Sequence, residues 1–167
     1  ILGGYPFSTY LKVADGCDNC CTYCAIPKIR GKMRSRKIED CIAEAKTLAE
    51  NGVKELIVVA QDTTAYGTDI YGKPMLSKLL SELCKIDGLK WIRTLYTYPE
   101  KITDELLDTI AQEPKLLKYL DMPIQHVNGE ILKRMNRKGN KETLTALINK
   151  IRAKIPNITL RTTLITG

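Results

Sequence analysis

Apolar residues follow two patterns along the chain, and the two patterns alternate. Short apolar runs predict strands at residues 10–14, 56–60, 91–96, 118–122 and 158–165. The run at 56–60 contains no polar residue, which is typical of a strand buried on both faces. Apolar residues spaced three and four apart predict helices at 38–49, 76–83, 130–135 and 142–154, and Thr103 followed by Asp104 and Glu105 marks the start of another helix.

Five alternations of strand and helix, without a Gly/Ser-rich linker, predict a single α/β domain with a parallel sheet. The length of 167 residues fits one globular unit at ~150 residues per domain. A closed barrel of about eight strand–helix units typically needs ~250 residues, which excludes it here. An open doubly wound sheet and an incomplete barrel both remain, because periodicity does not separate them.

Composition and charge narrow the class of protein only a little. No apolar run reaches the ~18 residues of a membrane span and no leader peptide is visible, so we expect a cytoplasmic protein. The net charge of 26 − 19 = +7 is compatible with an anionic partner such as a ribosome or a nucleic acid. The chain starts at Ile1 without a methionine and stops within a strand-like run, so we expect it to be part of a longer protein.

Four of the six cysteines lie within residues 17–24, which favours metal binding over a disulfide framework and indicates a reducing compartment. As a zinc site, the two C-x2-C pairs would follow one another with no separation, whereas structural zinc sites separate them by ~12–20 residues. The C-x2-C-x2-C run of bacterial ferredoxins does not occur. In a third interpretation, Cys17, Cys21 and Cys24 form C-x3-C-x2-C and hold three irons of a [4Fe–4S] cluster, leaving one iron open. Zinc remains the main alternative at this point.

The cysteine segment directly follows the first predicted strand. In parallel α/β sheets, ligand sites collect at the carboxyl ends of the strands. Its position therefore favours a reactive site over a purely structural one.

The same segment resembles the radical S-adenosylmethionine (SAM) enzymes, because C-x3-C-x2-C carries an aromatic residue, Tyr23, before its last cysteine. The sequence 24–27 (Cys-Ala-Ile-Pro), with Arg30-Gly31 and Ser35-Arg36, resembles the methylthiotransferases among them. Residues 61–67 (Gln-Asp-Thr-Thr-Ala-Tyr-Gly), 96–99 (Tyr-Thr-Tyr-Pro) and 123–126 (Pro-Ile-Gln-His) are similar to the branch that modifies a ribosomal protein. The tRNA-modifying branch would typically show Gln-Asn-Val, Ser-His-Pro and Pro-Val-Gln-Ser there. A tRNA adenosine methylthiotransferase and a non-enzymatic zinc-binding, nucleic-acid-binding module remain as alternatives.

This resemblance implies a partial, open (β/α) barrel of the radical SAM type, with about five strand–helix units. Residues 1–167 would form a radical SAM core domain that is incomplete at its C-terminal end. An N-terminal domain with a second [4Fe–4S] cluster and a C-terminal substrate-docking domain would lie outside the sequence. The implied activity is SAM-dependent addition of a methylthio group to an aspartate of a small-subunit ribosomal protein. The implied cofactors are a [4Fe–4S] cluster and SAM, and the implied partners are that ribosomal protein, in the context of the ribosome, and an electron-donor protein, with no membrane.

The resemblance also assigns residues, with Cys17, Cys21 and Cys24 as the iron ligands. The residues expected to contact the cofactor are Tyr23, Gln61, Gln125 and Arg161. Arg161 shares a strand face with Thr163 and Ile165, and we expect its guanidinium to point into the cofactor cavity toward the carboxylate of SAM.

Other candidate residues have less specific signals. We expect Cys41 and Cys84 to be buried helix residues, Cys20 to be a bystander and His126, the only histidine, to have a loop or capping role. Six cations within residues 28–37 form either an anion contact or a solvated loop, and the sequence leaves both open.

Overall fold

The computed structural model describes residues 7–166. Its strands are β1 (Ser8–Lys12), β2 (Ala14–Asp15), β3 (Arg34–Ser35), β4 (Glu55–Val59), β5 (Trp91–Thr94), β6 (Tyr119–Asp121) and β7 (Thr159–Arg161). Its α-helices are α1 (Ile26–Arg30), α2 (Ile38–Glu50), α3 (Thr68–Tyr71), α4 (Leu76–Cys84), α5 (Asp104–Gln112), α6 (Gly129–Arg134) and α7 (Lys141–Lys154), and a 3-10 turn, η1, spans Pro99–Lys101. None of these helices is long and apolar enough to span a lipid bilayer.

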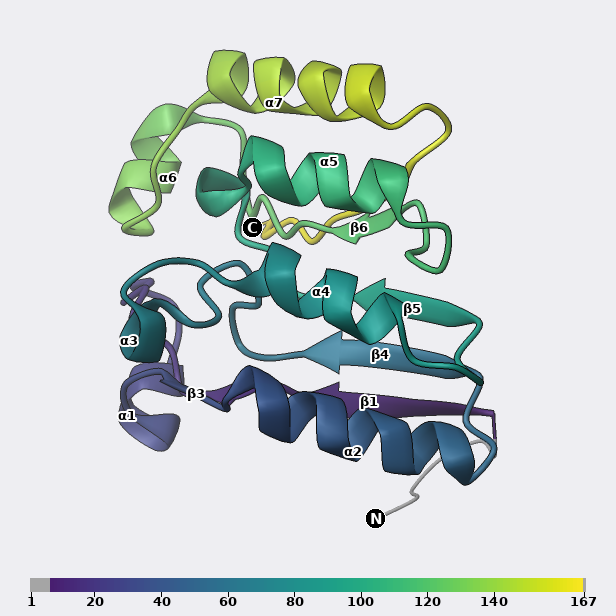
Figure 1. The fold of residues 1–167 in the computed structure, drawn as a ribbon. Helices are drawn as coiled ribbons and strands as arrows, with labels where there is room; N and C mark the ends of the chain where they lie inside the picture. The colour runs from purple at the N-terminus through teal and green to yellow at the C-terminus, as the bar shows by residue number, and fades with distance from the viewer. Residues whose placement is uncertain (1–6, 167) are drawn as a thin grey trace.

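The main strands run parallel and follow one another in chain order (Figure 1). β1, β4 and β5 form one hydrogen-bonded sheet, and β6 pairs with β7. A parallel bridge between Ile92 and Leu116 and the hydrogen bond from Thr97 N–H to Asp121 O (2.9 Å) connect the two parts. The five strands do not close into a barrel within residues 7–166, so the expected open, partial (β/α) barrel is confirmed.

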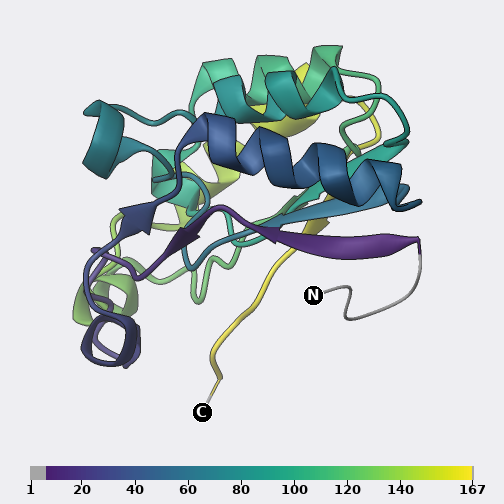
Figure 2. The same ribbon diagram turned by 60° about the horizontal axis from the view of Figure 1, so that its bottom comes forward.

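The helices α2, α4, α5 and α7 cover one face of this curved sheet (Figures 1 and 2). Alternate strand residues point into this layer, and five of them are almost fully buried: Leu11, Leu56, Val58, Ile92 and Leu120. The opposite face carries no helix among the described residues, and Tyr10 on that face is 60% exposed. Both faces of β4 were expected to be buried, but Ile57 and Val59 are only half-buried, because none of the described helices covers their face (Figure 2).

The sequence pattern did not predict the shortest elements, and it placed the ends of some predicted strands incorrectly. The strand expected at 10–14 starts at Ser8 and stops at Lys12, and Ala14 belongs to β2, which pairs with β3 in an antiparallel ribbon. The run expected at 158–165 is a continuous strand only from Thr159 to Arg161, followed by a bridge from Leu164 to Gln125. Elements of two to five residues hold too few positions for a periodicity to appear.

Burial of the helix cysteines gives a testable prediction. Cys41 in α2 and Cys84 in α4 lie in the core, whereas Cys20 is exposed. Burial raises the pKa of both core thiols, that of Cys84 to about 12, so each stays protonated and unreactive at about pH 8, because only the thiolate is nucleophilic. Mass spectrometry of metal-free protein alkylated with iodoacetamide should show Cys20 modified and Cys41 and Cys84 unmodified until denaturant is added. Labelling of Cys84 as fast as Cys20 in the folded protein would contradict this packing.

Candidate functional site

The cysteine loop, defined here as residues 16–25, begins with a glycine that no other residue can replace without displacing the backbone. Gly16 has φ of +77°, and a Cβ atom placed there would lie 2.1 Å from the carbonyl oxygen of Lys32. This close approach lets the Cys17 N–H donate to Gly31 O at 3.2 Å. The loop therefore leaves the β2–β3 ribbon in a fixed direction, across the carboxyl ends of the parallel strands.

A buried carboxylate then fixes the middle of the loop. Asp62, just after β4, is 2% exposed, and its Oδ2 accepts from Asn19 Nδ2 at 2.7 Å and from Lys101 Nζ at 2.8 Å. Lys101 Nζ also donates to Asn19 Oδ1 at 2.6 Å. The loop is thereby hydrogen-bonded to two other parts of the barrel, the end of β4 and η1.

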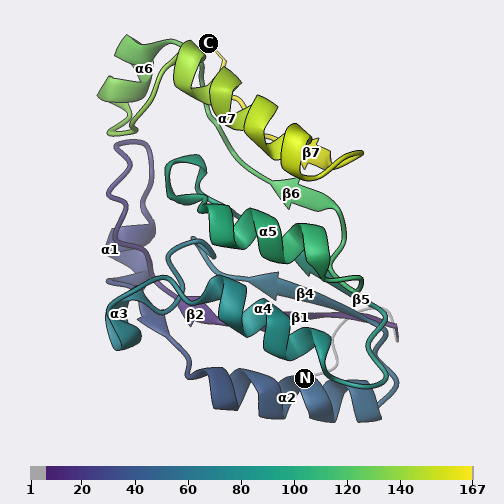
Figure 3. The same cartoon turned by 45° about the horizontal axis from the view of Figure 1, so that its top comes forward.

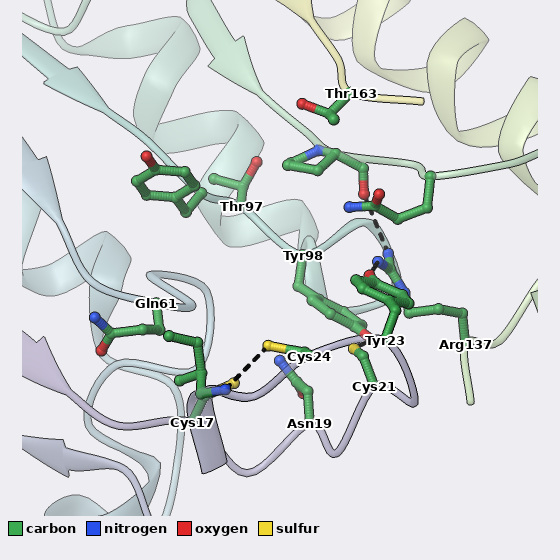
Figure 4. Close-up of a pocket in the computed structure, with 14 residues that line it drawn as sticks. Cys17, Asn19, Cys21, Tyr23, Cys24, Gln61, Thr97, Tyr98, Arg137 and Thr163 are labelled. Atoms are coloured by element: carbon green, nitrogen blue, oxygen red, sulfur yellow. Dashed lines mark hydrogen bonds between the residues drawn. The ribbon is translucent and has the colours of Figure 1, made fainter. Parts of the chain in front are cut away.

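The loop forms one wall of a cavity of about 270 Å³ at the carboxyl ends of the strands (Figure 4). Each strand end contributes to the lining. The lining residues are Cys17, Asn19, Cys21, Tyr23, Cys24, Ile26, Gln61, Tyr96, Thr97, Tyr98, Pro123, Gln125, Arg137 and Thr163. The volume is close to the ~300 Å³ at which small-molecule sites typically begin. Cys20, in contrast, is exposed and does not line this cavity.

The three cavity cysteines are half-buried and hydrogen-bonded in different ways. Cys21 Sγ lies 3.3 Å from the Tyr98 hydroxyl, and Cys24 Sγ accepts from the Ile26 N–H at 3.4 Å. Burial raises the pKa of the Cys17 thiol above its ordinary value. Within residues 7–166, no three His, Cys, Asp or Glu side chains converge closely enough to hold a single ion. A tetrahedral zinc site needs such convergence, whereas in a cluster of several irons each sulfur binds a different atom.

Three of the four residues expected to contact a cofactor line the cavity: Tyr23, Gln61 and Gln125. The Oε1 atom of Gln61 is buried without a hydrogen-bond partner among the described residues, so it can accept a hydrogen bond from a ligand. Gln125 has φ of +66°, a strained conformation held by hydrogen bonds from its N–H to Thr163 O (2.9 Å) and from the Ile165 N–H to its carbonyl (2.8 Å). Strain of this kind is common at ligand sites.

Arg161 is placed differently from the other three. Its side chain is 56% exposed and does not line the cavity, and its Nη1 lies 3.5 Å from Oδ1 of Asp121, its register partner on β6. The Asp121 charge raises the pKa of Arg161 above its ordinary value. Its contact here is thus a carboxylate of the chain itself, and contact with a cofactor stays a prediction. Thr163, two residues further along, does reach the cavity.

A buried arginine is the main site residue that sequence reasoning missed. The Arg137 side chain is 2% exposed and makes a two-pronged pair with Glu100, Nε to Oε1 and Nη2 to Oε2, both at 3.1 Å. Its guanidinium carbon lies 3.9 Å from the centre of the Tyr98 ring. Burial works against its charge, but Glu100 and the Tyr23 hydroxyl outweigh that effect and hold the pKa of Arg137 above its ordinary value. In the sequence, Arg137 is one of several cations at 133–141, and nothing local distinguishes it.

The remaining candidates have mainly structural surroundings. None of the six cations at 28–37 lines the cavity, and three of them form ion pairs: Arg30 and Arg34 with Asp15, and Arg36 with Glu44. Nδ1 of His126 accepts from the Asn128 N–H at 2.9 Å, which is a loop role as expected.

Known proteins resemble this chain over nearly its whole length. It is 60% identical over 158 residues to ribosomal protein uS12 methylthiotransferase RimO of Clostridium tetani, covering 95% of this chain and 36% of that protein. The identity to the RimO of Clostridium botulinum is 59% over 167 residues, covering 100% and 37%. To that of Elusimicrobium minutum it is 56% over 162 residues, covering 97% and 38%. The chain thus spans a little over a third of the length of these curated relatives.

Solved structures share the fold at much lower identity. The radical S-adenosylmethionine methyltransferase TsrM from Kitasatospora setae, solved with cobalamin and a [4Fe–4S] cluster bound, superposes with a TM-score of 0.73 at 16% identity, over 95% of this chain and 31% of that one. The cobalamin-dependent S-adenosylmethionine radical enzyme OxsB, with aqua-cobalamin and S-adenosylmethionine bound, gives 0.70 at 13% identity, over 93% and 23%. At this identity the likeness concerns the fold alone.

A family model completes the comparison. The model of the radical SAM superfamily matches residues 11–167, a range that includes every residue lining the cavity. The chain, with its open barrel and its three cysteines in one cavity, belongs to the radical SAM superfamily.

Proposed function

We propose that this chain is the cluster- and SAM-binding core of a methylthiotransferase that modifies an aspartate of ribosomal protein uS12. The observation that carries the proposal is the joint placement of Cys17, Cys21, Cys24, Gln61 and Gln125 around one cavity at the strand ends. The substrate is taken from the relatives, which are named ribosomal protein uS12 methylthiotransferase at 56–60% identity.

The donor set fits a [4Fe–4S] cluster. Thiolates are the ligands that iron–sulfur clusters take, and three of them line the cavity. Among the described residues, no fourth cysteine lines it, and the neighbouring Cys20 is exposed. Three protein ligands would leave one iron free for a substrate or cosubstrate.

When bound, such a cluster supplies the single electron that cleaves SAM and starts the radical chemistry of this family. The protein's part is to bind, orient and shield. The unpaired Oε1 of Gln61 is an acceptor for the amino group or a hydroxyl of SAM, and Gln125 and Tyr23 offer polar groups on the other walls. Ile26, Pro123 and the ring of Tyr96 form apolar walls that limit access of water.

The proposal includes parts outside this chain. They are an N-terminal domain with a second [4Fe–4S] cluster, a C-terminal domain that docks the substrate and an electron-donor protein. The reaction would take place on the ribosome, in the cytoplasm.

The ligand assignment can be tested by replacing single cysteines. After anaerobic reconstitution with iron and sulfide, Cys17→Ala, Cys21→Ala and Cys24→Ala should each lose the iron and the visible absorption of one cluster, because no other thiol lines the cavity. Cys20→Ala is the matched control and should keep both. Retention of the cluster in Cys21→Ala together with its loss in Cys20→Ala would reverse the assignment.

The role of Gln61 can be tested by SAM binding. Gln61→Leu removes the unpaired acceptor, so the affinity for SAM should fall about tenfold while the iron content stays unchanged. Gln112→Leu, the same replacement at an exposed position of α5, is the control. Equal SAM affinities of the two variants would remove Gln61 from the site.

The same assay decides the role of Arg161. Arg161→Lys keeps the charge and loses the planar fork, so SAM binding should weaken if the guanidinium reaches the SAM carboxylate. An unchanged affinity would remove Arg161 from the cofactor site and leave it the structural role of pairing with Asp121.

The substrate requires its own experiment on a cluster-loaded, full-length protein that joins this core to the proposed N-terminal and C-terminal domains, because we expect the core alone to be incomplete for full turnover. Given SAM, a sulfide source and a reductant, it should add a methylthio group to an aspartate of uS12, detectable by mass spectrometry of the digested protein. A methylthio group on tRNA adenosine instead would support the alternative branch of the family.

A further inference from the structure

A tyrosine hydroxyl reaches one of the three cavity sulfurs. Tyr98 follows β5, and its hydroxyl lies 3.3 Å from Cys21 Sγ (Figure 4). Cys24 Sγ, in contrast, accepts from a backbone group, the Ile26 N–H at 3.4 Å. A cysteine that ligates iron is a thiolate and has no proton to give, so in the loaded protein Tyr98 is the donor.

Arg137 holds the Tyr98 ring in this position. Its guanidinium lies over the ring face, 3.9 Å from the centroid, where a cation is attracted by the π electrons. The backbone of Tyr98 is fixed separately, because its N–H donates to Thr64 Oγ1 at 3.1 Å. With the main chain and the ring face both held, the hydroxyl has little freedom to move away from the sulfur.

Arg137 is itself fixed by a charge and by two neighbouring segments. Both prongs of its guanidinium pair with Glu100, and Nη2 also donates to Pro123 O at 3.3 Å. The preceding residue, Asn136, donates from Nδ2 to Cys20 O at 3.0 Å, which ties the segment after α6 to the cysteine loop. α6 and α1 accordingly lie at the same end of the molecule, beside the loop (Figure 3). Nη1 of Arg137 also donates to the Tyr23 hydroxyl at 3.4 Å, so the buried guanidinium is held from several sides and its position is well determined.

We propose, on the basis of the function proposed above, that Tyr98 sets the reduction potential of the cluster through its hydrogen bond to Cys21, and that Arg137 and Glu100 are positioning residues for Tyr98. Reduction adds one electron, taken from a one-electron reductant, and so increases the negative charge on the cluster and its sulfurs. A hydrogen bond to a ligating sulfur stabilises this reduced state more than the oxidised one. The bond therefore makes the cluster easier to reduce.

The test is a redox titration of the reconstituted protein, followed by electron paramagnetic resonance. The resonance signal to follow is the one that is absent from the Cys21→Ala variant. This choice distinguishes the cluster in the cavity from any other iron–sulfur cluster. Tyr98→Phe keeps the ring and removes only the hydroxyl. We expect it to bind the same amount of iron, while the ratio of reduced to oxidised cluster at a fixed potential falls about three- to tenfold.

Tyr66→Phe is the matched control. Tyr66 is fully buried where Tyr98 is half-buried, and its hydroxyl donates to Arg36 O at 2.8 Å, away from the cavity. Its replacement removes a buried phenol hydroxyl with a similar structural cost and should leave the potential unchanged. Equal potentials in Tyr98→Phe and Tyr66→Phe, at full iron content, would overturn the proposal.

The positioning role of Arg137 has a second measurement. Arg137→Lys keeps the positive charge but loses the fork to Glu100, so the potential should fall by part of the Tyr98→Phe shift. Combining Arg137→Lys with Tyr98→Phe should add no further shift, because Arg137 acts through the hydroxyl that is already absent. Additive shifts would show that Arg137 acts on the cluster directly and would refute its positioning role.

If Arg137→Lys does not fold, Tyr98→Phe alone decides the effect of the hydroxyl. If the unmodified protein binds no cluster, the proposed function fails instead.

Discussion

The buried carboxylate of Asp62 is the interaction on which the site depends. It stands where β4 ends, and both of its oxygens are used: Oδ1 accepts from the Thr64 hydroxyl and the Ala65 N–H, and Oδ2 accepts from Asn19 and Lys101. A buried charge is costly unless it is paired and hydrogen-bonded, so Asp62 favours the single arrangement that satisfies it. In that arrangement the cysteine loop lies across the strand ends and its three cavity cysteines face the same space.

Backbone strain is concentrated around this space. Four of the five non-glycine residues with positive φ lie in the cavity wall, in the cysteine loop or next to Arg137: Cys20, Tyr96, Gln125 and Asn136. Such conformations cost on the order of 1 kcal/mol or more each and persist only where the surroundings enforce them. Here hydrogen bonds do so, for example from the Tyr96 N–H to Asp121 Oδ2 (3.1 Å) and from Asn136 to Cys20. The helices on the other face of the sheet supply the apolar core, whose burial offsets this cost. Stability and ligand binding therefore depend on different parts of the molecule.

An ion pair in the cavity wall also connects distant parts of the chain. Glu100 follows β5 and the buried Arg137 follows α6, and their ion pair brings Tyr98, Tyr23 and Pro123 together on one wall. Long-range contacts thus add to the local hydrogen bonds within each loop in holding the polar groups of the site. A rigid wall of this kind keeps ligands and hydrogen-bond donors in place before a cofactor binds, which is the general requirement for an effective site.

The sequence by itself determined the α/β class, the parallel strands, most of the longer helices, the three-cysteine motif and the superfamily. These features are local, because the periodicity of one element and the cysteine spacing of one loop depend only on residues close together in the sequence. It also indicated Gln61 and Gln125, because both follow predicted strands and parallel strands end at one edge. Only the tertiary structure decided that Arg137 is buried against Tyr98, that Asp62 holds Asn19, and that Arg161 pairs with Asp121. These contacts join residues 39 to 43 positions apart along the chain, and whether a charge meets its partner across such a separation depends on how the helices and strands pack together.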